Sequence, residues 1–158
     1  MNCRPNKLTP GFTLLEILMV VAIMGILVTI IITSFSTLNK AQALDKSARQ
    51  GASILNQARM LTLSSKEDSV YGVHFESSEI TLFKGGSYSS NDPDNIISPL
   101  NSIVSITNIN LSGGGVDVIF GRLTGNTNTP GTVTFSLDSS TATKTISVSG
   151  TGLIEIED

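Results

Sequence analysis

The sequence predicts an α+β fold, in which one long N-terminal helix packs on a β-sandwich-like head of antiparallel strands. Apolar residues run almost without interruption from Phe12 to Phe35 and continue at helical spacing to Ala58. From Tyr71 onwards apolar residues alternate with polar ones, and clusters of Gly, Ser and Asn separate the alternating runs. The period of the apolar pattern therefore changes once along the chain, from that of a helix to that of strands.

The bulk composition allows about one domain with an appendage and excludes several classes of partner. The 158 residues carry a net charge of −3 and only 15% charged side chains, with no basic cluster. We therefore expect no binding to nucleic acid. The only cysteine is Cys3, so the rest of the chain offers neither a disulfide nor a cysteine metal site. No apolar stretch precedes Cys3, which argues against lipoprotein processing.

The segment 12–35 is long enough to cross a membrane. Its 24 residues correspond to about 36 Å of helix, against a hydrocarbon core of about 30 Å. The basic residues Arg4 and Lys7 precede it, which predicts a cytoplasmic N-terminus and an exported remainder. A secretory signal peptide has a shorter apolar run that ends in a small-residue cleavage site. A plain signal anchor fits the length but leaves Glu16 unexplained.

The residues at the start of this segment resemble a known processing site. The run from Lys7 to Glu16, KLTPGFTLLE, is similar to the cleavage and methylation motif of type IV prepilins and type II secretion pseudopilins. The resemblance implies that a prepilin peptidase cuts between Gly11 and Phe12 and methylates the new amino terminus of Phe12. It makes residues 1–11 a prepilin leader, and 12–35 a transmembrane helix that later forms the filament core.

Glu16 is the conspicuous carboxylate of the apolar segment. It lies four residues after Phe12, on the same helix face, so it could pair with the amine that cleavage frees. Pairing within one subunit or with a neighbour would avoid an unpaired charge and could set the axial register of assembly. The alternative is a carboxylate that simply reaches the membrane surface.

Residues 36–65 are predicted to continue the same helix. No proline occurs between Phe12 and Ser65, so one helix of about 50 residues is expected, with Gly25 and Gly51 as its weak points. Its apolar stripe is predicted to pack on the chain's own sheet, the alternative being a seam for a partner helix. The stripe consists of Leu38, Ala41, Leu44, Ala48, Ala52, Leu55 and Ala58.

Residues 66–158 are predicted to form the β-rich head. Glycine- and serine-rich turns separate the expected strands, and Gly85–Pro99 has the composition of a long exposed loop. The strands are expected around residues 71–75, 80–82, 103–111, 116–120, 133–137, 146–148 and 154–156.

The last 45 or so residues of the head add a second resemblance. The runs IFGRLTG (119–125), GTVTF (131–135) and ISVS (146–149) are similar to the H-type/FimT-like group of minor pilins and pseudopilins. Some members of that group carry arginines after the glycine of the last hairpin, and these are linked to DNA capture. Here Gly152 is followed by Leu153, Ile154 and Glu155, which argues against DNA binding.

No catalytic, metal or cofactor site is predicted. His74 is interpreted as an exposed strand histidine, with no serine and carboxylate to complete a triad. The run 91–95, NDPDN, offers oxygen ligands of the kind calcium prefers, but it is better explained as a solvated turn. Gly113–Gly115 lacks the Lys-Ser/Thr of a phosphate loop. We therefore expect a protein that is not an enzyme.

The expected function is that of a structural subunit, a minor pilin or a pseudopilin. Its expected place is the inner membrane, crossed once with the N-terminus in the cytoplasm, and then an extracellular or periplasmic filament. The implied partners are membrane lipid, the prepilin peptidase, an inner-membrane assembly platform and other subunits. The competing hypotheses are a pilus-tip binding module on the same scaffold, either an adhesin or a minor pilin for DNA uptake, and a signal-anchored enzyme.

Overall fold

The fold combines one long helix with two antiparallel sheets, which confirms the predicted α+β class. The computed structural model describes residues 11–138 and 141–157, without the side chains of 31–37. Contacts divide the chain into two compact units, Met1–Leu38 and Asn39–Asp158. We call them the helical unit and the head unit and describe each by itself. In chain order the elements are α1 (Leu14–Leu63), η1 (Lys66–Asp68), β1 (Tyr71–Phe75), β2 (Glu79–Lys84), β3 (Ile96–Pro99), β4 (Val104–Leu111), β5 (Asp117–Ile119), β6 (Gly131–Leu137), β7 (Thr143–Val148) and β8 (Ile154–Glu157).

Helix α1 is unbroken over 50 residues, as the absence of proline predicts. Gly25 and Gly51 both lie inside it without interrupting it. The helix ends where Ser65 adopts a left-handed backbone, with φ 50°. The backbone then turns through η1 into β1.

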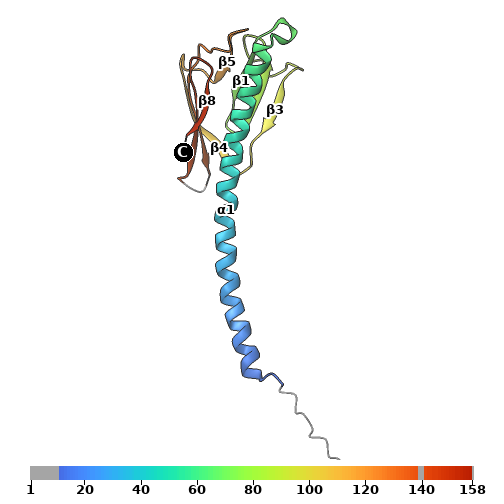
Figure 1. The fold of residues 1–158 in the computed structure, drawn as a ribbon, viewed down its shortest axis with the longest axis vertical. Coiled ribbons are helices and arrows are strands. Elements are labelled where there is room, and N and C mark those ends of the chain that lie inside the picture. Colours follow the sequence, from blue (N-terminus) through green and yellow to red (C-terminus); the bar gives the residue numbers. More distant parts are fainter. Residues whose placement is uncertain (1–10, 139–140, 158) are drawn as a thin grey trace, which may run out of the picture. The chain divides into compact units, whose positions relative to one another are not determined.

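The strands of the head unit form two sheets of four strands each. The first has the order β3-β2-β1-β5 and the second has the order β4-β6-β7-β8, and every pairing is antiparallel. On β1, Val73 and Phe75 are buried in the core, while His74 between them points to the outer face of the first sheet. In Figure 1 β3 of the first sheet and β8 of the second lie on opposite sides of the head-unit part of α1.

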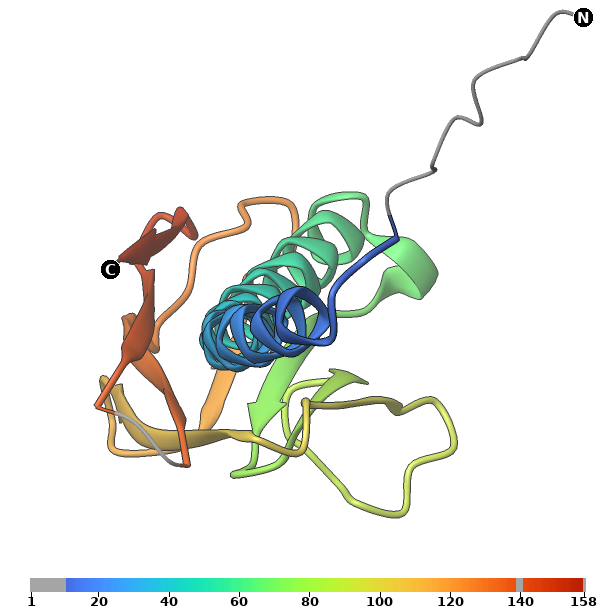
Figure 2. The same cartoon turned by 90° about the horizontal axis from the view of Figure 1, so that it is seen from below.

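The head-unit part of α1 contributes to the same core as both sheets. Seen end-on in Figure 2, the strands curve around this part of the helix. At Gly51 the approach is so close that an added Cβ would lie 2.9 Å from Ile146 Cδ1, 3.0 Å from Phe135 Cζ and 3.2 Å from Ile80 Cδ1. These three side chains come from β7, β6 and β2. Gly51 therefore allows the helix to contact both sheets at once.

Two predictions about the head need correction. The predicted exposed loop Gly85–Pro99 contains a strand at its end, because β3 pairs with β2 along the edge of the first sheet. The predicted stripe is buried from Leu44 to Ala58, whereas Leu38 and Ala41 are exposed. The packing on the chain's own sheets therefore begins at Leu44, since the two earlier stripe positions find no cover in the described residues.

Candidate functional site

The first turn of α1 has a defined cap. The backbone N–H of Glu16 donates to the Thr13 hydroxyl at 3.2 Å, and the N–H of Ile17 donates to the Thr13 carbonyl at 3.2 Å. Thr13 is thus the N-cap residue, and Glu16 is the third residue of the helix, where the helix dipole favours a carboxylate. The sequence analysis missed this cap, although Thr-x-x-Glu before an apolar run is its signature.

Gly11, Phe12 and Glu16, the predicted processing and assembly residues, are all exposed at this end of the helix. No atom would lie within 4 Å of a Cβ added to Gly11, so the backbone there is open. Phe12 is 80% exposed. The rest of the predicted leader, with Cys3, Arg4 and Lys7, lies outside the described residues. The cleavage, the methylation and the pairing of Glu16 remain predictions.

The surface of the helical unit is apolar and uncovered. The large apolar side chains from Phe12 to Ile30 are between 48% and 83% exposed. Phe12, Ile17 and Val21 line an open hollow of about 710 Å³ along this surface. Within the part of the chain that the structure describes, no helix reaches the length and apolarity of a membrane span. The predicted span 12–35 includes residues 31–35, whose side chains lie outside the described residues, so the predicted crossing stays a prediction.

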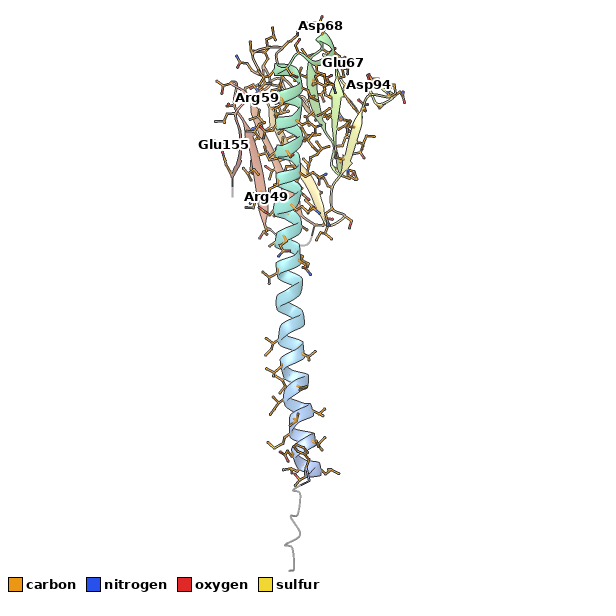
Figure 3. The ribbon with its side chains drawn as sticks, turned by 45° about the vertical axis from the view of Figure 1, so that its right-hand side comes forward. Arg49, Arg59, Glu67, Asp68, Asp94 and Glu155 are labelled. Carbon is orange, nitrogen blue, oxygen red and sulfur yellow. The ribbon has the colours of Figure 1, made fainter. Side chains whose placement is uncertain are left out.

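Arg59 joins α1 to two loops of the head unit. Its Nε donates to the Gly125 carbonyl at 3.3 Å and its Nη2 donates to the Thr151 carbonyl at 3.4 Å. A Cβ on Gly152 would lie 2.0 Å from the Gly125 oxygen and 2.8 Å from Arg59 Nε. Figure 3 shows Arg59 on the helix. Gly125 and Gly152, which belong to the second resemblance, therefore allow the two loops of this chain to pack closely.

A second arginine and a lysine hold the turn that follows α1. Ser65, Glu67 and Asp68 all have positive φ, at 50°, 52° and 57°. Arg122 donates from Nε to the Ser65 hydroxyl at 2.7 Å and forms an ion pair with Asp68. Lys84 donates to Glu67 at 2.5 Å, and this hydrogen bond holds the pKa of the Glu67 carboxyl below its usual value. Figure 3 labels both acids in this turn. The contacts account for a strained turn made without glycine.

The interpretation of His74 as an exposed histidine is wrong. Its side chain is 14% exposed. Nδ1 lies 2.5 Å from Asp117 Oδ1, Nε2 lies 3.3 Å from Glu76 Oε1, and the ring stacks on Tyr88 with centroids 3.7 Å apart. Because the two ring nitrogens point in opposite directions, the acids cannot join His74 around one ion. Over residues 11–138 and 141–157, no group of three acidic, histidine or cysteine side chains could hold a metal.

The run 91–95 forms an organised turn. The N–H of Asp94 donates to Asp92 Oδ1 at 2.9 Å, and Asn95 Nδ2 donates to the Ser89 carbonyl at 2.7 Å. These are the local hydrogen bonds that Asp and Asn make in turns. They agree with the expectation of a solvated turn.

A hollow of about 470 Å³ in the head unit lies beside β5. Its lining side chains are all neutral: Val70, Ile119, Phe120, Gly121, Thr124, Asn126, Asn128 and Thr129. It therefore holds no group that could act as a general acid or base near neutral pH.

The comparisons with known proteins identify a family. A family model described as type II transport protein GspH matches residues 47–152, about two thirds of the chain. The match includes the last part of α1 and extends over the strands to the turn before β8. The search of curated proteins and the search of solved structures each found no significant match.

Proposed function

The chain belongs to the family of type II transport protein GspH, and on this premise we propose that it is a pseudopilin subunit of a secretion filament. In this proposal a prepilin peptidase cuts between Gly11 and Phe12 and methylates Phe12. Helix α1 first anchors the chain in the inner membrane and then packs against the helices of other subunits. The head has a structural role and catalyses no reaction.

The observation that carries this proposal is the uncovered apolar surface of the helical unit. Fourteen large apolar side chains between Phe12 and Ile30 are about half exposed or more. An apolar surface of this size indicates contact with lipid or with partner proteins. A subunit that moves from membrane to filament would cover it in both states.

The position of Glu16 supports a role in assembly. As the third residue of a capped helix, its carboxylate lies near the end of α1, where cleavage would place the amine of Phe12. Among the described residues from Gly11 to Ile30 it is the only charged one. A pair between Glu16 and a Phe12 amine would therefore be the main electrostatic contact that fixes the offset between helices.

The cleavage is tested through the single cysteine of the chain. Cys3 lies in the proposed leader, so removal of the leader abolishes labelling by a thiol reagent. We expect the full chain to be labelled when it is expressed alone and to be unlabelled after co-expression with a prepilin peptidase. N-terminal sequencing should then begin at methylated Phe12. Labelling that persists with an active peptidase, or a cut after residue 35, would refute the proposal.

The assembly role of Glu16 is tested with two substitutions. Glu16→Gln removes the charge but keeps a side chain that suits the third position of a capping box. Glu16→Ala removes the charge and the capping side chain. If charge pairing sets the register, both variants are cleaved normally and both enter filaments poorly. Glu155→Gln serves as the matched control in the head and should assemble normally. Normal assembly of Glu16→Gln would show that capping, and not charge, is what Glu16 supplies.

A further inference from the structure

The long loop between β2 and β3 is closed over the outer face of the first sheet by one aromatic side chain. Tyr88 stacks on His74 with an interplanar angle of 12°, and its edge meets Phe83 with centroids 5.7 Å apart. Phe83 is only 1% exposed, yet it lies outside the central core, to which its neighbour Leu82 belongs. The loop therefore covers a small second apolar layer.

Two acidic side chains of the sheet hold the imidazole in the position on which the loop stacks. Asp117 from β5 faces Nδ1 at 2.5 Å, and Glu76, just after β1, faces Nε2 at 3.3 Å. The phenol ring of Tyr88, from the loop, covers one side of the imidazole. Glu79 on β2 lies on the same outer face, and no ion pair joins it to His74 among the described residues.

We propose that His74 and Tyr88 form a protonation-dependent latch for the loop 85–95. A neutral imidazole has one N–H and one lone pair, whereas the imidazolium donates from both nitrogens. With a carboxylate at each nitrogen, only the charged ring satisfies both acids. When the ring loses its proton, the lone pair of one nitrogen faces a carboxylate oxygen, and the repulsion turns the ring away from the position on which Tyr88 stacks. The stack with Tyr88 also loses its cation–π attraction.

The construction of the loop allows it to open as a unit. Its first residues, Gly85 and Gly86, have no atom within 4 Å of an added Cβ, and Gly85 has φ 112°. Hydrogen bonds from Asn95 to Ser89 and from Asp94 to Asp92 hold the far part of the loop together. The loop can therefore rotate about the two glycines while its own turn stays intact.

The fluorescence of Tyr88 reports the state of the latch. The chain contains two tyrosines and no tryptophan, so Tyr71→Phe leaves Tyr88 as its only strong emitter. Acrylamide, a neutral quencher, is added to the full chain in detergent micelles between about pH 5 and about pH 8, the range in which histidine changes charge. We expect quenching of Tyr88 to increase toward the higher pH, because the loss of one partly exposed ion pair raises the ratio of open to closed loop by about 1.5-fold to 5-fold.

Three variants in this background separate the latch from a general effect of pH. His74→Gln should show strong quenching that no longer depends on pH. Glu76→Gln should show weak quenching at every pH, because an amide can donate to the neutral ring and accept from the charged one. Glu79→Gln, which removes a carboxylate from the same face, should behave like the parent.

Quenching that is constant with pH in the parent, or a pH dependence that survives in His74→Gln, overturns the proposal. Thermal melting monitored by circular dichroism confirms that each variant is folded. If His74→Gln fails to fold, the opposite and independent prediction for Glu76→Gln decides.

Discussion

The contact between the two glycine loops at Arg59 makes a quantitative prediction. Gly152 has φ 76°, a left-handed backbone that costs an alanine about 1 kcal/mol. Its added Cβ would also lie 2.0 Å from the Gly125 carbonyl oxygen. The two loops must separate to restore ordinary contact, and this breaks the hydrogen bond of 3.3 Å from Arg59 to Gly125. Loss of a hydrogen bond to a charged group costs about 1.5–3 kcal/mol. Gly152→Ala should therefore destabilise the head unit by about 2.5–4 kcal/mol.

A matched variant isolates the contribution of the close approach. Gly114 has nearly the same backbone, with φ 71°, but no atom lies within 4 Å of its added Cβ. Gly114→Ala should therefore cost only the backbone part, about 1 kcal/mol. Both variants of the head unit, residues 39–158, are compared with the parent by urea unfolding. A difference between the two variants of less than about 1 kcal/mol, below the cost of the broken hydrogen bond, would refute the role assigned to the contact.

Three further predictions follow from other parts of the structure. Gly51→Leu should lower head stability by about 1–3 kcal/mol through overpacking, whereas Gly25→Leu, at an open position of the same helix, should leave the melting temperature of the head unchanged. Thr81→Val should raise stability by about 1 kcal/mol, because it removes a buried hydroxyl without a partner; a loss of stability in urea unfolding would contradict this. Lys84→Met should destabilise the head slightly at about pH 7. Since Lys84 lowers the pKa of Glu67, the ion pair stabilises the head above the usual carboxyl pKa, and this stabilisation is lost as the pH falls through the lowered pKa. The effect of Lys84→Met should therefore be smaller at about pH 3 than at about pH 7. An equal effect at both pH values would argue against the ion pair.

The sequence predicted those parts of the fold that depend on a repeated pattern. The helical period from Leu44 to Ala58 and the absence of proline were enough for an unbroken α1 and its buried face. Strand β3 escaped prediction because it is an edge strand, with Ile96 and Ile97 both about half exposed. Such a strand shows no alternation between buried and exposed residues, and only its pairing with β2 reveals it.

The side-chain contacts that connect the parts of the head could not be predicted from the sequence, for a different reason. Arg59 and Gly125 are 66 residues apart, and His74 and Asp117 are 43 residues apart. No local pattern links residues at such separations in the sequence, so His74 was interpreted as an ordinary exposed strand residue. The cap at Thr13 is the opposite case, since both its residues lie within one turn and its signature was present in the sequence.

The cap also changes how the start of α1 is understood. A threonine that satisfies the N–H of Glu16 lets the helix begin at Leu14 without help from the residues before it. Removal of the proposed leader would therefore leave the first turn intact, because neither partner of this hydrogen bond precedes Phe12. The carboxylate of Glu16 would then keep its place while a new amine appears four residues earlier. In the proposed pseudopilin, cleavage would add a charge beside a helix end that is already formed, so processing and assembly need no refolding of the anchor.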